Sequence, residues 1–199
     1  MRDSATIRTP MIDAIWPTGR AQWLRYAILA VLGSLLIAVS SKIQVPFYPV
    51  PMTMQTLVVL AIGMAYGLRL GGATLLLYLA EGASGLPVFA GTPEKGIGLA
   101  YMMGPTGGYL LGFLLAAVMV GWLAERGFDR NVFTAALAML AGNVLIYAPG
   151  VLWLGAVVGW DKPVLEWGLT PFLWGDAFKL ALAAVLMPGI WYMLGRKRG

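Results

Sequence analysis

Long apolar runs, interrupted by few charges, restrict the fold of this chain more than any other feature. A spanning helix needs about 20 apolar residues, because the hydrocarbon core of a bilayer is about 30 Å thick. The runs cover residues 24–41, 52–66, 71–83, 106–123, 132–158 and 170–194. Only 12% of the residues are charged, whereas a soluble domain has about 25%. Lipid offers the backbone no hydrogen-bond partners, so these runs are expected to form helices.

The runs predict an all-α membrane protein with six transmembrane helices. Residues 1–199 are expected to form a single integral membrane domain, with a basic cytoplasmic N-terminal segment at 1–22 and a six-helix bundle at 24–194. The runs 52–66 and 71–83 are short for a span. They are therefore expected to be tilted, broken or partly buried in protein.

Two connections between the runs have distinctive compositions. Residues 42–51 contain Pro46, Pro49 and Pro51, a spacing that rejects helix and favours an extended segment. Residues 84–108 are rich in Gly and Pro and predict a long re-entrant or external loop.

The basic residues favour a topology with both termini in the cytoplasm. The inner segments then hold Arg2, Arg8, Arg20, Arg25, Arg69, Arg126, Arg130, Arg196, Lys197 and Arg198. The outer segments hold Lys42, Lys95 and Lys162. Cytoplasmic loops of membrane proteins carry the excess of Lys and Arg, so this distribution supports six spans in the cytoplasmic (inner) membrane. The net charge of +5 is thus a sign of topology, and no nucleic-acid partner is expected.

Two residue types are absent from the chain, and their absence narrows the chemistry. It contains no cysteine and no histidine, which removes thiolate chemistry, the commonest metal ligand and the usual general base. The stretch 91–96 has a lysine among glycines but lacks the spacing of a phosphate-binding loop. No enzyme activity, cofactor or metal site is therefore expected.

Two charged residues lie within the last apolar run. Asp176 and Lys179 are three residues apart, so they share one face of a helix. Ionisable residues inside a membrane are costly, which makes them candidates for function. They either form a neutralising pair within the helix or face a pocket. In a pocket, Lys179 would hold an anionic group and Asp176 would accept hydrogen bonds from N–H donors.

Asn143 and Tyr147 lie four residues apart in the fifth run, and both can donate and accept hydrogen bonds. They are expected to face the interior of the bundle. There they either bond another helix or contact a ligand.

Further candidates lie near the expected outer ends of two helices. Thr106, Gly107 and Tyr109 open the fourth run, where free backbone N–H groups could meet an anion or a carbonyl. Thr53 and Gln55 follow the proline-rich connection and could close over a ligand.

Small residues recur every four positions in three places, a spacing that allows close approach of helices. The rows are Gly104, Gly108 and Gly112; Gly63, Gly67 and Gly71; and Ala30, Ser34 and Ala38. Each row fits either packing inside the bundle or a docking surface for a partner subunit. The third row is the preferred candidate for docking.

Several long motifs in order resemble the BioY family. They are PFYPVPMTMQT at 46–56, YLAEGASGLPVFAG at 78–91, GPTGGYLLGF at 104–113, the pattern from Gly142 to Leu154, and the pattern from Pro171 to Lys179. The chain departs from the family at Glu94 and Lys95, which put charge into a stretch that is usually uncharged.

This resemblance implies an energy-coupling factor (ECF) S component that captures biotin with high affinity near the outer face. Asp176 and Lys179 are similar to the family's polar ligand-binding pair, and the first connection would act as a lid. The resemblance further implies a transmembrane T subunit as partner, docked on the first helix, and paired ABC-type ATPases. The sequence leaves open whether the chain also forms a homo-oligomer.

Two other functions remain open on the residues alone. One is a stand-alone facilitator or secondary transporter, although the halves show no inverted repeat. The other is an S component for a different vitamin, since the charged pair favours a carboxylate-bearing ligand without fixing which one. A membrane enzyme is a more distant alternative.

Overall fold

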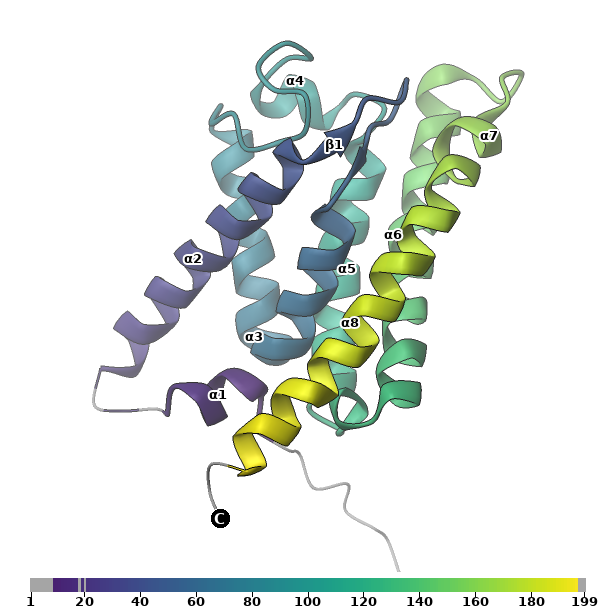
Figure 1. Cartoon of the computed structure of the whole chain (residues 1–199). Helices are drawn as coiled ribbons and strands as arrows, with labels where there is room; N and C mark the ends of the chain where they lie inside the picture. The colour runs from purple at the N-terminus through teal and green to yellow at the C-terminus, as the bar shows by residue number, and fades with distance from the viewer. Residues whose placement is uncertain (1–8, 18, 20, 197–199) are drawn as a thin grey trace, which may run out of the picture.

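A computed structural model describes residues 9–17, 19 and 21–196 (Figure 1). Its elements are α1 (Met11–Ile15), α2 (Gln22–Lys42), β1 (Gln44–Val45), β2 (Met52–Thr53), α3 (Gln55–Ala83), α4 (Gly98–Met102), α5 (Gly107–Ala124), η1 (Phe128–Arg130), α6 (Val132–Val158), α7 (Val164–Gly168) and α8 (Thr170–Arg196). Five of the basic residues used for the topology, Arg2, Arg8, Arg20, Lys197 and Arg198, lie outside the described residues.

The expected all-α membrane fold is confirmed, but the helices are divided differently from the prediction. Five helical segments within the described residues are long and apolar enough to cross a membrane, namely α2, α3, α5, α6 and the stretch Val164–Gly195, which contains α8. The runs 52–66 and 71–83, expected as two separate helices, both fall in α3 apart from residues 52–54, which precede it.

Helix α3 consists of two helical segments, and the chain reverses direction between them at Gly67 (Figure 1). The Gln55 amide donates to the Tyr78 hydroxyl at 2.6 Å, although these residues would be about 35 Å apart along a straight helix. Gly67 has φ +78° and ψ −178°, a conformation essentially restricted to glycine. The Glu125 carboxylate accepts the adjacent Leu68 N–H at 2.9 Å and so fixes the turn.

Gly67→Ala is expected to lower the stability of the folded protein in detergent, by about 1–3 kcal/mol from backbone strain alone. A Cβ atom at this position would also lie 2.7 Å from Glu125 Oε1 and 2.9 Å from Pro10 Cγ. Thermal unfolding would measure the change. The matched comparison is Gly85→Ala, because Gly85 also has a positive φ (+96°) but no atom lies within 4 Å of the added Cβ. It therefore carries backbone strain without the clash. A wild-type melting temperature for Gly67→Ala would contradict this account of the turn.

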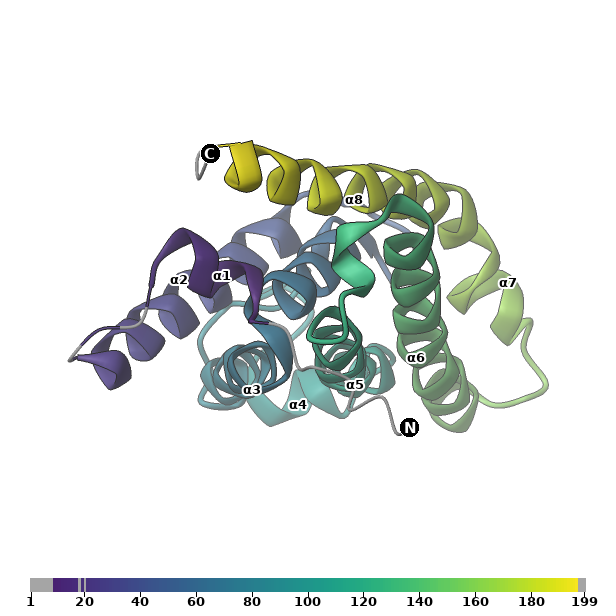
Figure 2. The ribbon, with the colours of Figure 1, turned by 90° about the horizontal axis from the view of Figure 1, so that it is seen from below.

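Glycines allow the central helices to pack closely. Helix α5 lies between α3 and α6, and α8 packs on α6 and α3 (Figure 2). A Cβ atom on Gly112 would lie 2.7 Å from the backbone of Ile146 in α6, and one on Gly63 would lie 2.7 Å from the backbone of Ala117 in α5. The two glycine rows therefore serve packing inside the bundle, the first of the two interpretations that the sequence allowed.

The row on the first helix does not form an exposed surface. Ser34 is 1% exposed, and its hydroxyl donates to Glu81 of α3 at 3.0 Å. Ala30 and Ala38 are half-buried. The exposed face of α2 instead carries large apolar side chains such as Leu35, which is 57% exposed. Ser34 thus faces α3, whereas Ala30 and Ala38 remain partly accessible. Docking of a partner subunit on Ala30, Ser34 and Ala38 stays a prediction.

One end of the bundle is rich in loops and carries β1, β2, α4 and α7 (Figure 1). The extended connection predicted from the prolines is confirmed as an antiparallel hairpin in which Gln44 pairs with Thr53 and Val45 with Met52. We call residues 44–53 the hairpin. The long loop that follows α3 is tied to α2, because the Lys42 ammonium donates to the carbonyls of Phe89 and Thr92 at 2.9 and 3.2 Å.

The opposite end of the bundle is covered by α1. Met11 is 1% exposed and belongs to the core, and Asp13 forms a 2.8 Å ion pair with the buried Arg25. Part of the segment 1–22, expected to precede the bundle, is therefore packed against it.

Candidate functional site

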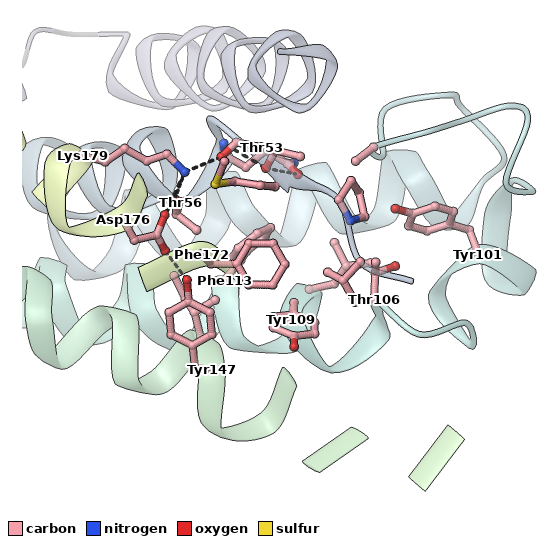
Figure 3. A pocket seen from close by; sticks show the side chains of 17 residues that line it. Thr53, Thr56, Tyr101, Thr106, Tyr109, Phe113, Tyr147, Phe172, Asp176 and Lys179 are labelled. Atoms are coloured by element: carbon pink, nitrogen blue, oxygen red, sulfur yellow. Dashed lines mark hydrogen bonds and ion pairs between the residues drawn. The ribbon is translucent and has the colours of Figure 1, made fainter. Parts of the chain in front are cut away.

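A small cavity lies inside the loop-rich end of the bundle. It is enclosed by the hairpin and by side chains from α3, α4, α5, α6 and α8 (Figure 3). Its volume is about 50 Å³, well below the roughly 300–1,000 Å³ of typical ligand pockets. A ligand larger than a few atoms can enter only if parts of this wall move.

The buried pair Asp176 and Lys179 forms one polar end of the cavity. Asp176 is 4% exposed and Lys179 is 7% exposed, and Lys179 Nζ lies 2.8 Å from Asp176 Oδ1. The sequence left open whether these residues form a pair within α8 or face a pocket. The structure has both features, since the paired residues also line the cavity.

The hydrogen bonds around this pair are extensive. Lys179 also donates to the Thr53 carbonyl at 2.7 Å and to the Thr56 hydroxyl at 3.1 Å. Asp176 accepts from Thr56 at 2.9 Å and from the Tyr147 hydroxyl. An ammonium group has three donors, so all the donors of Lys179 are used. The result is a compact neutral cluster that presents a carboxylate beside an ammonium.

Aromatic side chains form the body of the cavity. Tyr147 stacks on Phe172 with ring centroids 6.3 Å apart, and Tyr109 meets Tyr147 edge-on at 6.4 Å. The Tyr109 hydroxyl donates to the Gly168 carbonyl at 2.7 Å, which fixes its ring. Phe113 completes the wall. Such a surface suits a flat apolar ligand body.

The far end of the cavity, away from the charged pair, carries the hydroxyl groups of Tyr101 and Thr106 (Figure 3). Tyr101 stacks on Phe89 with centroids 5.0 Å apart. Burial raises the pKa of the Tyr101 hydroxyl above its ordinary value, which is itself well above physiological pH, and the protonated hydroxyl can donate. This end can therefore accept a polar or anionic tail by hydrogen bonding.

Six of the eight residues proposed as ligand-binding line the cavity, namely Asp176, Lys179, Tyr147, Tyr109, Thr106 and Gln55. The Gln55 amide is already bonded to Tyr78, and Thr53 donates to its oxygen at 3.4 Å. Gln55 therefore supports the wall at the base of the hairpin.

Asn143 and Gly107 do not line the cavity. Asn143 is buried one helical turn from Tyr147, beside a narrow gap that Thr56, Asp176 and Lys179 also border. The Gly107 N–H, expected to be free for a ligand, donates to the Gly104 carbonyl at 3.1 Å.

The sequence analysis did not propose Thr56, Tyr101, Phe113 or Phe172 as ligand contacts, although all four line the cavity. Thr56 directly follows Gln55 and could have been found from that position. No spacing or composition signal distinguishes the three aromatic residues from ordinary core residues.

The fold and the cavity define a polytopic membrane protein that encloses a site for a small solute. Residues 11–196 match the sequence profile of the BioY family, and the chain belongs to this family. A relative from Thermotoga maritima, the biotin transporter BioY, is 39% identical over 82% of this chain and 94% of its own. A probable biotin transporter BioY from Pyrococcus horikoshii is 37% identical over 79% of this chain and 91% of its own.

A solved structure has the same fold. The crystal structure of the S-component for biotin from an ECF-type ABC transporter matches with a TM-score of 0.73 over 92% of this chain and 96% of that chain. The two sequences are 24% identical, so this likeness concerns the fold alone. The related proteins above are named as transporters, in agreement with the expectation that this chain is not an enzyme.

Proposed function

We propose that this chain captures biotin from outside the cell and serves as the substrate-binding S component of an ECF-type transporter. The observation that carries the proposal is the buried cluster of Asp176, Lys179, Thr56 and Tyr147 at the end of an aromatic cavity. Biotin has a ureido ring with N–H donors beside a carbonyl, an apolar thiophane body and a carboxylate tail. The cavity offers groups of matching chemistry in that order.

The 2.8 Å distance within the charged pair favours a revised pose. The sequence suggested that Lys179 holds the carboxylate and Asp176 the N–H groups. A lysine already neutralised by a carboxylate is a weaker anion site, whereas adjacent acceptor and donor groups complement the N–H and C=O of one ureido ring. In this pose the carboxylate points toward Tyr101 and Thr106.

The hairpin is proposed to act as the lid of the site. Phe47 packs edge-on against Phe172, with ring centroids 6.3 Å apart. Met52 packs against Gly175, since a Cβ atom added to Gly175 would lie only 2.8 Å from Met52 Sδ. These contacts close the cavity without covalent restraint. The 50 Å³ volume means that part of the wall must move before biotin can enter, and the hairpin is the part proposed to move.

The proposed topology has six spans in the cytoplasmic membrane, with α3 counted as two, and both termini on the cytoplasmic side. The ends of the bundle support this sidedness. The connections that follow α2, α3 and α6 lie at the loop-rich end, and they hold or adjoin Lys42, Lys95 and Lys162 (Figure 1). The turn within α3 and the connection after α5, which hold Arg69 and Arg126, lie at the opposite end. A T subunit and ATPases would supply energy, lipids would cover the exposed apolar faces, and self-association stays open.

Equilibrium binding of labelled biotin to the purified protein tests the assignment. Wild-type protein is expected to bind biotin and biotinamide, in which an amide replaces the carboxylate. Lys179→Met is expected to raise the dissociation constants of both ligands by a similar factor of about 10 to 100, because a hydrogen bond to a charged group is worth about 1.5–3 kcal/mol.

Three outcomes would change these assignments. Loss of affinity for biotin but not for biotinamide in Lys179→Met would restore the original pose. Failure of folded wild-type protein to bind biotin would exclude biotin and favour another vitamin. Uptake by the chain alone in vesicles, dependent on a proton gradient, would favour a stand-alone transporter.

A further inference from the structure

Asn143 carries a buried acceptor that has no hydrogen-bond partner among the described residues. Asn143 is 8% exposed, and its unpaired atom is the side-chain oxygen Oδ1. Buried polar groups in native proteins are nearly always bonded, so an exception calls for a physical explanation. Asn143 lies outside the cavity and also borders a large, mainly apolar groove between α6 and α8. The Tyr147 hydroxyl, the other side-chain donor in the lining of this groove, already donates to Asp176.

The gap beside Asn143 is bordered by the ammonium-bearing Lys179. Thr56 and Asp176 border the same gap, which has no room for a water molecule. Lys179 uses its three donors on Thr53, Thr56 and Asp176. One residue with an unpaired acceptor and one with a saturated donor group therefore border the same narrow gap.

One of the three acceptors of Lys179 belongs to the lid. Thr53 is the last residue of β2, and its carbonyl accepts from Lys179 at 2.7 Å. Thr56 and Asp176 instead belong to the helices α3 and α8. If the hairpin moves away from α8, Lys179 loses this acceptor while keeping the other two.

We propose that Lys179 exchanges the Thr53 carbonyl for Asn143 Oδ1 when the lid opens. The lysine stem is flexible, and Asn143, whose buried Oδ1 is unpaired, borders the same gap as Lys179. The exchange keeps the ammonium fully bonded in both ligand-free states. Asn143 is then a positioning residue that sets the balance between closed and open lid. This inference rests on the proposed function in one respect, namely that the hairpin opens to admit the solute.

The exchange predicts opposite effects from two substitutions at one position. Asn143→Leu removes the acceptor that Lys179 would use in the open state, so it is expected to lower the fraction of molecules with an open lid. Asn143→Asp strengthens that acceptor with a negative charge and is expected to raise it. Lys179→Met removes the group that is exchanged, so it frees the lid and makes substitutions at Asn143 silent. A residue with a merely structural role would not produce this reversal of sign.

Spin labels on the lid and on a fixed helix would measure the populations. The chain has no native cysteine, so Tyr48→Cys and Glu166→Cys can be labelled selectively. Tyr48 is 84% exposed at the lid, and Glu166 is exposed in α7. Distance distributions by pulsed electron resonance, recorded in nanodiscs without ligand, give the open fraction. The exposed Lys162→Met is the matched control for Lys179→Met.

In folded protein, the open-to-closed ratio is expected to fall for Asn143→Leu and rise for Asn143→Asp, each by about fivefold. Lys162→Met is expected to leave it unchanged. Equal distributions for Asn143→Asp and wild type, shifts of the same sign in the two Asn143 variants, or persistent Asn143 effects in Lys179→Met would overturn the exchange. The measurement uses no biotin, so its failure is distinguishable from failure of the proposed ligand.

Discussion

Asp176→Ala is expected to raise the dissociation constant for biotin by about 100-fold or more. A hydrogen bond to a charged group is worth about 1.5–3 kcal/mol, and removing one partner of a buried ion pair costs about 3–5 kcal/mol. Asp176 accepts from Thr56, Tyr147 and Lys179 at once. The substitution therefore removes a ligand contact and also leaves three donors without their acceptor. Isothermal titration of the purified protein would measure the affinity.

A double variant separates loss of binding from loss of fold. In Asp176→Leu/Lys179→Met both charges are gone, and replacing a buried pair by apolar residues is often neutral or stabilising. The melting temperature is expected to recover while biotin binding stays absent. The matched control is Asp161→Ala, which breaks the exposed pair with Lys162 and should change neither property. Wild-type affinity in folded Asp176→Ala would contradict the site.

The helices were predictable because hydropathy reports directly on the need to bury apolar runs in lipid. The break between 66 and 71 was also visible, since residues 67–70, which include Arg69, separate the two runs. The antiparallel arrangement of the two segments of α3 was not predictable, because it depends on contacts between distant residues such as Gln55 and Tyr78. The packing of α1 depends in the same way on the pair between Asp13 and Arg25.

The charged part of the site was predictable for an energetic reason. A charge inside a span is costly, so Asp176 and Lys179 are conspicuous in the sequence. Thr56 and Tyr101 were missed because hydroxyl side chains occur commonly in helices and cost less to bury than charges do. Asn143 and Tyr147 share a helix face, but they differ in depth by one turn. Periodicity reports the face and not the depth, so it could not show that Tyr147 alone of the two reaches the cavity.

The direction of a small-residue row is equally hidden in the sequence. The spacing of Ala30, Ser34 and Ala38 fits a partner subunit and a neighbouring helix equally well. Ser34 faces α3 because Glu81 offers an acceptor there. If a T subunit docks on α2, it meets the large exposed side chains, such as Val31 and Leu35, before it meets this row.

Gly112→Leu is expected to abolish the folded protein. A Cβ at this position would lie 2.7 Å from Ile146 Cα and 2.9 Å from the Leu145 carbonyl, and both are backbone atoms of α6 that cannot rotate away. Overpacking by even small groups costs about 1–3 kcal/mol, so Gly112→Ala should already lower the melting temperature. Leucine adds three further carbons in the same space and would force α5 and α6 apart.

Gly189→Ala is the matched control for this prediction. Gly189 also lies within a long helix, but nothing is within 4 Å of an added Cβ. Alanine there is expected to be neutral or to stabilise α8 by up to about 0.5–1 kcal/mol, since glycine is unfavourable inside a helix. Size-exclusion profiles and melting temperatures in detergent would compare the variants. Monodisperse, wild-type-like protein from Gly112→Leu would mean that α5 and α6 do not pack through Gly112. The wall that holds Tyr109 against Tyr147 would then need another explanation.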